Sequence, residues 1–212
     1  MITIFYYKLN DLWNEKIFSQ HLSKLPLIQQ QKILLYKDKK DQQLRLCGKL
    51  MLLQLLRDLE VFPENGLNDM TYDEYNKPSF KGNFNFSIAH SDDYVVCAAS
   101  IQNSVGIDIE KIKSIDVLLL KDFFSKDEWT TIEENNYDTN YFYFLWTRKE
   151  AVMKTIGKGV YEEMGKIDVL KDEIIYQAKS YYIQDLSINY SYRIALACNF
   201  ISTYNIKEFV SP

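Results

Sequence analysis

The amino-acid sequence predicts an α+β fold made of two halves of similar content, about residues 1–102 and 103–212. In each half, apolar residues with helical spacing alternate along the chain with short segments that have the period-two pattern of antiparallel strands. No Ser/Gly-rich linker separates the halves. A chain of 212 residues with 47% hydrophobic side chains is long enough to bury a core as one domain or as two closely packed halves.

The first half is expected to begin with a strand and to place its helices before a strand pair. Alternating side chains predict strands at residues 2–7, 84–88 and 94–100. Helical spacing predicts helices at residues 25–36 and 43–59, and the second is apolar around much of its circumference, as buried central helices are. We expect a turn-rich stretch at 62–81 and a polar turn at 90–93 between the last two strands.

The second half repeats this mixture. Strands are predicted at residues 105–110, 167–170, 173–177, 179–182 and 192–198. Helices are predicted at residues 116–124, 126–134 and 141–156. Gly157 and Gly159 are placed to end the last of these helices.

Composition narrows the classes of function. The net charge of -4 argues against a nucleic-acid-binding protein, although Lys37, Lys39 and Lys40 form one basic cluster. Three distant cysteines, no CxxC motif and no signal-peptide pattern predict reduced thiols and a cytoplasmic protein. No apolar stretch approaches the ~20 residues that span a bilayer, so we expect no membrane association.

Two segments carry charged side chains in a pattern that suggests phosphate chemistry. Asp108 and Glu110 lie two positions apart on a predicted strand and therefore share one face. Glu150 and Lys154 lie four positions apart on one face of the predicted helix. Three carboxylates and an ammonium group, if brought together, would suit Mg²⁺ bound with a substrate phosphate.

Taken separately, each of these features also has a purely structural interpretation. Asp108 and Glu110 could lie on a solvated strand face, where most charged residues are found. Glu150 and Lys154 could form a surface ion pair worth about 0.5 kcal/mol. The run of residues 157–159, Gly-Lys-Gly, is typical of a helix end, and it differs from a phosphate-binding P-loop, which precedes its helix.

The order of the motifs along the chain is more specific than any one of them. The series is Asn-Lys-Pro at 76–78, Phe-Asn-Phe-Ser-Ile-Ala-His-Ser at 84–91, Gly-Ile-Asp-Ile-Glu at 106–110, Phe-Phe-Ser at 123–125, Trp-Thr-Arg-Lys-Glu-Ala-Val-Met-Lys at 146–154 and Gly-Lys-Gly at 157–159. With this series the chain resembles the 4'-phosphopantetheinyl transferases, specifically the larger monomeric type that activates peptide, polyketide and fatty-acid synthases, such as surfactin synthetase. The resemblance is close over about residues 72–160 and loose elsewhere.

The resemblance implies a fold, a reaction and partners. The two halves would be related by a pseudo-twofold axis, with the active site in the cleft between them. Coenzyme A, as co-substrate, and Mg²⁺, with Mn²⁺ as a second option, would bind there. The enzyme would be a monomer that moves 4'-phosphopantetheine to a serine of an acyl or peptidyl carrier protein and releases adenosine 3',5'-bisphosphate.

The resemblance also suggests roles around the metal. Asp108, Glu110 and Glu150 would surround Mg²⁺, with Asp108 as the surest ligand. Glu150 would be either a ligand or the general base that takes the serine proton, and Glu110 could exchange roles with it. Lys154 would balance the negative charge that develops on the transferred phosphate.

At the nucleotide end of coenzyme A, the resemblance points to a second group of residues. Lys77 and His90 match positions that hold this end, with His90 donating to a phosphate as a partly or fully protonated imidazole. Arg45 is a candidate for the 3'-phosphate, and Lys32 is a weaker candidate of the same kind. The backbone of Tyr75 and Asn76 is expected near the adenine.

Two positions and one short segment depart from the family pattern. Asn76 replaces the usual glycine, and asparagine tolerates positive φ better than most residues. Ala89 replaces a serine and so removes a hydroxyl that could bind phosphate, a loss for which Ser87 or Ser91 could compensate. Residues 29–31, all glutamine, occupy a segment that is often more cationic. We therefore expect an active enzyme with altered cofactor contacts.

Other interpretations stay open at this stage. The chain could be a catalytically silent relative that binds coenzyme A or a carrier protein, an unrelated Mg²⁺-dependent phosphotransferase or nucleotide-binding domain, or a scaffold with an aromatic contact surface. For the transferase, the carrier protein is expected to dock around residues 111–140. There Leu118, Leu119, Phe123 and Phe124 could form either a docking surface or part of the core.

Overall fold

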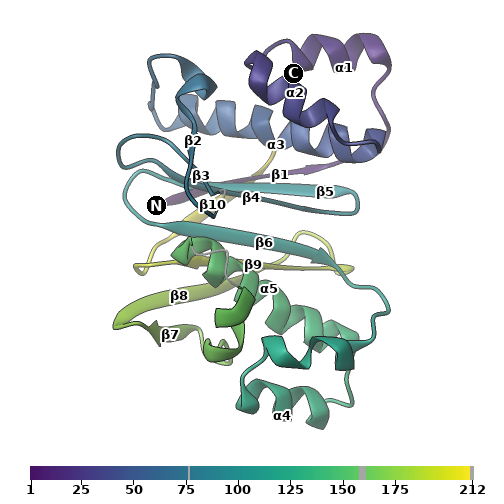
Figure 1. The fold of residues 1–212 in the computed structure, drawn as a ribbon, viewed down its shortest axis with the longest axis vertical. Coiled ribbons are helices and arrows are strands. Elements are labelled where there is room, and N and C mark those ends of the chain that lie inside the picture. The colour runs from purple at the N-terminus through teal and green to yellow at the C-terminus, as the bar shows by residue number, and fades with distance from the viewer. Residues whose placement is uncertain (76, 158–160, 211–212) are drawn as a thin grey trace.

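The computed structural model of the protein describes residues 1–75, 77–157 and 161–210. Its elements form four layers, a helix layer, a sheet, a second sheet and a second helix layer, as Figure 1 shows. The longest helix of the first half, α3 (Lys39–Asp58), covers the outer face of the first sheet. Its counterpart α5 (Thr139–Ile156) covers the outer face of the second sheet.

The first sheet has four strands in the order β10-β1-β5-β4. Their bounds are β1 (Ile2–Lys8), β4 (Asn85–Ser91), β5 (Tyr94–Ser100) and β10 (Tyr204–Glu208). Strand β10 runs parallel to β1, with Ile2 opposite Tyr204, whereas β1, β5 and β4 are antiparallel neighbours. The end of the chain therefore returns to the sheet that the start of the chain builds.

The second sheet also has four strands, in the order β6-β9-β8-β7, and every pair is antiparallel. Their bounds are β6 (Val105–Lys111), β7 (Glu173–Tyr176), β8 (Lys179–Leu186) and β9 (Tyr192–Cys198). The remaining elements are α1 (Glu15–Leu22), α2 (Leu27–Leu34), α4 (Lys126–Glu134), the short pair β2 (Thr71–Tyr72) and β3 (Pro78–Ser79), and the 3-10 turns η1 (Gly66–Asp69), η2 (Val117–Phe123) and η3 (Tyr161–Lys166).

The two halves share a chain path. In the first, β1 leads to α3 and then to the β4–β5 hairpin, whose second strand pairs with β1. In the second, β6 leads to α5 and then to the β8–β9 hairpin, whose second strand pairs with β6. The predicted α+β fold with two similar halves is therefore confirmed.

Three apolar clusters hold the layers together. One lies between α3 and the first sheet, one between α5 and the second sheet, and the third between the two sheets. The third contains Ile4 and Val96 from the first sheet and Ile107 and Ile194 from the second, all 2% exposed or less. Because burial of apolar surface is the main stabilising contribution to folding, this shared core holds the halves in one register.

Several sequence-based boundaries were wrong, for identifiable reasons. Helix α3 begins at Lys39, four residues earlier than predicted, because the Asp38 carboxylate caps it by accepting from the N–H of Asp41 at 2.9 Å. The predicted polar turn begins later, since His90 and Ser91 still belong to β4. Helix α1 and strand β10 were not predicted.

The strand predicted at residues 167–170 is absent because side chains take its backbone groups. The Lys149 ammonium binds the carbonyl of Ile167, the Val169 N–H donates to Glu128 Oε1 at 2.8 Å, and Arg148 binds the Val169 carbonyl at 3.1 Å. With those groups occupied, the segment forms no ladder. Among the described residues, no helix is both long and apolar enough to cross a bilayer.

Candidate active site

The close approach of β6 and α5 positions the first pair of charged side chains. A Cβ atom at Gly106 would lie 2.1 Å from the Ala151 carbonyl oxygen and 2.6 Å from the Thr155 nitrogen. Only glycine permits two backbones to come this near. The contact brings Asp108, two residues further along β6, beside Lys154 on α5.

Asp108 is buried, and its two oxygens have different surroundings. Oδ1 accepts a hydrogen bond from Lys154 Nζ at 2.6 Å. Oδ2 is buried without a hydrogen-bond partner in the described structure. Burial raises the pKa of Asp108, while Lys154 acts in the opposite direction. The Oδ2 atom of this buried carboxylate is thus left to bind a further ligand.

Glu110 is held by a residue from the other half. Ser91 Oγ, at the end of β4, donates to Glu110 Oε2 at 2.7 Å and accepts from the Lys111 N–H at 3.1 Å. Burial and, to a smaller extent, the charge of Asp108 raise the pKa of Glu110, whereas the Ser91 hydroxyl lowers it. The two halves therefore meet in a polar contact directly beside a candidate carboxylate.

Glu150 on α5 completes the acidic group. Burial, followed by the charges of Asp108 and Glu110, raises its pKa to about 7, with Lys154 acting against the shift. For Lys154, burial lowers the pKa, but Asp108, Glu150 and Glu110 together outweigh it and raise the pKa. Within the described part of the chain, no three Asp, Glu, His or Cys side chains are gathered closely enough to hold a metal ion as they stand. The carboxylates are electrostatic neighbours, and the ammonium group lies among them.

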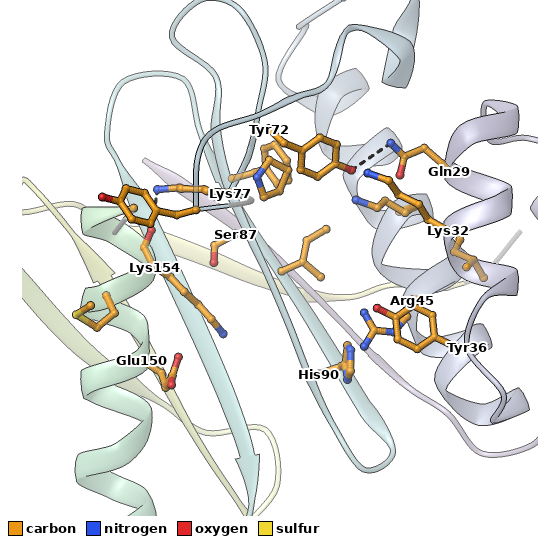
Figure 2. Close-up of a pocket in the computed structure, with 18 of the residues that line it drawn as sticks. Gln29, Lys32, Tyr36, Arg45, Tyr72, Lys77, Ser87, His90, Glu150 and Lys154 are labelled. Carbon is orange, nitrogen blue, oxygen red and sulfur yellow. Dashed lines mark hydrogen bonds between the residues drawn. The ribbon is translucent and has the colours of Figure 1, made fainter. Parts of the chain in front are cut away.

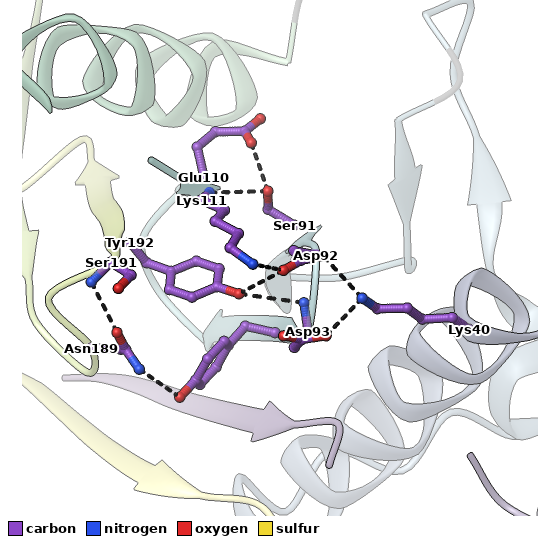
Figure 3. A network of polar contacts seen from close by, with 10 residues as sticks. Lys40, Ser91, Asp92, Asp93, Glu110, Lys111, Asn189, Ser191 and Tyr192 are labelled. Atoms are coloured by element: carbon purple, nitrogen blue, oxygen red, sulfur yellow. Dashed lines mark hydrogen bonds and ion pairs between the residues drawn. The ribbon is translucent and has the colours of Figure 1, made fainter. Parts of the chain in front are cut away.

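A network of polar contacts beside Ser91 also joins the two halves of the chain, as Figure 3 shows. Asp92, in the turn after β4 with a positive φ of 51°, binds both Lys40 of α3 and Lys111 of β6. Tyr192 of β9 donates its hydroxyl to Asp92 at 3.4 Å. Lys111 and then Lys40 lower the pKa of Asp92 to about 2. One carboxylate thereby joins a helix of the first half to two strands of the second.

A cavity of about 550 Å³ opens between the halves and reaches from α2 and α3 to α5. It is lined by seven of the residues predicted from the sequence, namely Lys32, Arg45, Tyr75, Lys77, His90, Glu150 and Lys154. In Figure 2, Lys32 and Arg45 lie on one side of it, Glu150 and Lys154 on the other. Asp108 and Glu110 are not among the lining residues, and Asn76 lies outside the described residues.

Lys77 and His90 contact the cavity in different ways. Lys77 Nζ donates to the Lys154 carbonyl at 2.7 Å, and its side chain passes Gly157, the left-handed residue that ends α5. His90 Nε2 lies 3.9 Å from Asp41 Oδ1. Burial and then Arg45 lower the pKa of His90, with Asp41 opposing them. The free protein therefore favours a neutral imidazole at His90.

The cations on the helix side stack on aromatic rings. Arg45 lies 3.6 Å from the ring centre of Tyr36 and donates to Asp41 Oδ1 at 3.2 Å. Lys32 lies 3.6 Å from the ring centre of Tyr72. Such cation–π contacts fix the direction of long, mobile side chains.

Sequence reasoning missed other lining residues. The cationic one is Lys49, which stands four residues after Arg45 on α3, a spacing that places both on one helix face. Others are Gln29, Tyr36 and Tyr72, of which Gln29 donates to the Tyr72 hydroxyl at 3.3 Å. The helical spacing was a usable signal for Lys49; nothing local in the sequence joins Gln29 to Tyr72.

Ala89 is buried in the cluster between the sheets and does not line the cavity, so a hydroxyl at this position would point away from it.

The segment expected to meet the carrier protein contains both exposed and buried apolar side chains. Leu118 and Leu119 are 59% and 79% exposed, whereas Phe124 is buried in the core and Phe123 is half-buried against it.

Both halves of the chain match models of known protein families. Residues 104–206 match the model described as the 4'-phosphopantetheinyl transferase superfamily. Residues 13–102 match the model described as 4'-phosphopantetheinyl transferase, N-terminal.

Individual relatives agree with these matches. The 4'-phosphopantetheinyl transferase gsp of Aneurinibacillus migulanus is 35% identical over 164 residues, which cover 76% of this chain and 68% of that protein. The 4'-phosphopantetheinyl transferase Sfp of Bacillus subtilis is 42% identical over 91 residues, which cover 41% of this chain and 40% of that protein. The L-aminoadipate-semialdehyde dehydrogenase-phosphopantetheinyl transferase of Mus musculus is 40% identical over 96 residues, which cover 41% of this chain and 31% of that protein.

Proposed function

The chain belongs to the 4'-phosphopantetheinyl transferase superfamily, and we propose that it transfers 4'-phosphopantetheine from coenzyme A to a serine of an acyl or peptidyl carrier protein. The serine oxygen would form a bond to the phosphorus that carries the pantetheine arm. The bond from that phosphorus to the bridging oxygen would break, so that adenosine 3',5'-bisphosphate leaves. One observation carries the proposal, a single cavity that joins cations at one end to Glu150 and Lys154 at the other.

The acidic group fits a hard divalent cation. Asp108 offers the buried and unpartnered Oδ2, and its charge raises the pKa of both Glu110 and Glu150. Oxygen ligands of this kind suit Mg²⁺, with Mn²⁺ as a second option. We therefore assign Asp108, Glu110 and Glu150 as the residues that would hold the ion. When bound, it would supply positive charge against the pyrophosphate.

Lys154 and Glu150 are suited to the transfer step. The Lys154 ammonium, fixed by Asp108, would balance negative charge on the phosphate that moves. Glu150 would be either a ligand of the ion or the general base that accepts the serine proton, and the pKa of about 7 that burial gives it in the metal-free chain favours the second role at neutral pH. Glu110 stays the alternative base, since its pKa is also raised.

The other end of the cavity would bind the nucleotide part of coenzyme A. Arg45 and Lys32 are held over aromatic rings at the rim, where an anion would meet them. His90 would gain a proton as a phosphate approaches, because an anion favours the charged imidazole. Lys77 would add a further positive charge near α5, and Tyr75 would lie near the adenine.

For the carrier protein we propose a docking surface that contains the exposed Leu118 and Leu119. The location in the cytoplasm, the monomeric state and the absence of nucleic-acid and membrane partners stay predictions. The reduced cysteines expected in the cytoplasm agree with Cys47, Cys97 and Cys198, which are buried and free.

The test is direct. The purified chain is incubated with Mg²⁺, coenzyme A and several apo carrier proteins, and each carrier is weighed by mass spectrometry. We expect the mass increment of phosphopantetheine on the acceptor serine, and no increment when the metal is chelated. If no carrier gains mass, the transferase assignment is wrong and the silent-relative interpretation takes its place.

A further inference from the structure

Lys49 is a cavity cation without a carboxylate partner. It lies on α3, one helical turn after Arg45, and lines the cavity between the halves. The hydrogen-bond partner found for its ammonium group is the thioether sulfur of Met70, a weak acceptor at 3.8 Å. In the described part of the chain, no acidic side chain forms an ion pair with it.

The charges around Lys49 have the same sign. Burial lowers its pKa, Tyr72 and Cys97 act in the opposite direction, and the two fixed positive charges nearby, Lys32 and Arg45, lower it further. Of these two cations, Arg45 already has the Asp41 carboxylate as its partner. A local excess of positive charge therefore remains where α2, α3 and the Tyr72 strand meet the cavity.

A partly buried cation without a counter-charge is unfavourable, because it loses hydration without gaining an ion pair. Such groups gather at functional sites, where the ligand supplies the missing charge. An anion entering the cavity would do so here. Of residues 29–31, all glutamine, Gln29 lines the cavity, so the positive charge at this end comes from other residues.

Coenzyme A carries phosphate at two separate places, the pyrophosphate and the 3'-phosphate on the ribose. The pyrophosphate contains the bond that breaks and must lie by Lys154 and the carboxylates. Figure 2 shows Lys32 and Arg45 on the side of the cavity opposite Glu150 and Lys154. Lys49 stands one turn after Arg45 on α3, within electrostatic reach of both cations, and so belongs to their cluster. On the basis of the proposed function, we propose that Lys49 binds the 3'-phosphate of coenzyme A and selects for it.

The experiment measures binding without a carrier protein, so it does not require transfer. Calorimetry with the whole chain and Mg²⁺ compares coenzyme A, 3'-dephospho-coenzyme A and adenosine 3',5'-bisphosphate. Lys49→Met keeps the length of the side chain and removes its charge. Lys39→Met is the matched control, because Lys39 is an exposed lysine on the same helix outside the cavity.

We expect Lys49→Met to lower the affinity for coenzyme A and for adenosine 3',5'-bisphosphate by about 10- to 100-fold, the range for a hydrogen bond to a charged group. The affinity for 3'-dephospho-coenzyme A should change by less than about 2-fold, so the preference for the 3'-phosphate is lost. Lys49→Arg should recover most of it. The thermal midpoint of the unliganded Lys49→Met protein should stay level or rise, since an unpaired buried cation is removed.

Two results would overturn the assignment while leaving the transferase function intact. The first is an equal loss for coenzyme A and its dephospho form, which would move Lys49 to the pyrophosphate or to a structural role. The second is unchanged affinity for all three ligands. If the unaltered chain binds no coenzyme A at all, the proposed function and the role of Lys49 fail together.

Discussion

Lys154 Nζ lies 2.6 Å from Asp108 Oδ1, while the other oxygen of the same carboxylate is buried and unpartnered. The ion pair joins α5 to β6 at the point where Gly106 lets the two backbones touch. It places a positive charge among three carboxylates before any ligand arrives. The arrangement therefore separates two functions of Asp108, fixing the lysine and offering an oxygen to a cation.

Asp108→Asn should abolish most of the transfer without unfolding the protein. The amide keeps the size of the side chain but removes the charge that holds Lys154 and would hold the metal. A loss of about 100-fold or more in the rate of carrier mass gain is expected, as for other removed charge-stabilising groups. Circular dichroism checks the fold. Near-normal activity of Asp108→Asn or Asp108→Ala at limiting Mg²⁺ would refute the metal assignment.

Glu150 should make the metal-free protein less stable as the pH rises. Its pKa is about 7 in the folded chain, against an ordinary value of 4.5, so the folded state holds the proton more tightly than the unfolded state does. The stabilising contribution is complete below about pH 4.5 and is lost as the pH rises through about 7.

Thermal midpoints measured in a chelator between about pH 5 and pH 8 test this. The midpoint of the unaltered chain should fall over this range by more than that of Glu150→Gln, which cannot titrate there. Glu64→Gln, at an exposed glutamate, serves as the control and should follow the unaltered chain. Parallel curves for the unaltered chain and Glu150→Gln would contradict the raised pKa.

Ser91→Ala should shift the pH dependence of transfer as well as stability. The change removes the hydroxyl that donates to Glu110 and accepts from the Lys111 N–H, so the pKa of Glu110 should rise further. A loss of about 1–3 kcal/mol in unfolding free energy is expected for the unsatisfied groups. Activity should fall at neutral pH and recover in part at higher pH.

Ser87→Ala is the matched control, because Ser87 Oγ also joins β4 to β6 but accepts only from the Ile107 N–H at 3.1 Å. It should lower stability to a similar extent and leave the pH profile of transfer in place. An identical pH profile for both variants would show that Ser91 is structural only.

The elements that the sequence predicted well are those with a buried face. Strands β5, β6 and β9 alternate or are wholly buried, and α5 has a clear end at Gly157. Strand β10 was not predicted because its side chains are mostly exposed and the strand with which it pairs, β1, lies about two hundred positions earlier in the sequence. The false strand at residues 167–170 has strand-like apolar spacing, but Lys149 and Glu128 bind its backbone.

The candidate site divides in the same way. The positions of Asp108, Glu110, Glu150 and Lys154 followed from periods of two and four along the chain. Which of these side chains contact one another could not be predicted in this way, because that depends on the position of α5 along β6. The contact of Ser91 with Glu110 arises from the packing of two sheets, for which no short-range pattern exists. A site between two halves is predictable residue by residue but not contact by contact.

Gly106→Ala should unfold the second half or prevent its folding. The new Cβ would lie 2.1 Å from a backbone oxygen and 2.6 Å from a backbone nitrogen, neither of which is the mobile end of a side chain. A destabilisation of more than about 3 kcal/mol is expected. Denaturant unfolding measures it.

Gly48→Ala offers the comparison within the same chain. There the new Cβ would meet Ile88 Cγ2 at 3.0 Å, a side-chain atom that can shift, and alanine is about 1 kcal/mol better than glycine inside a helix. The net change should be within about 1 kcal/mol. Similar losses for both variants would mean that the close approach of β6 and α5 has no special importance.

Leu119→Asp should weaken the binding of the carrier protein without changing the affinity for coenzyme A. Leu119 is 79% exposed on η2 and packs little of its surface, so its replacement should leave the thermal midpoint within a few degrees. If the carrier docks here, a buried charge at the contact should raise the KM for apo carrier by about 10-fold or more. The affinity for coenzyme A, measured by calorimetry, should stay the same. Leu12→Asp, at a leucine 55% exposed in the first half, is the control and should change neither. A carrier KM that Leu119→Asp and Leu12→Asp leave equally unchanged would place the docking surface elsewhere on the protein.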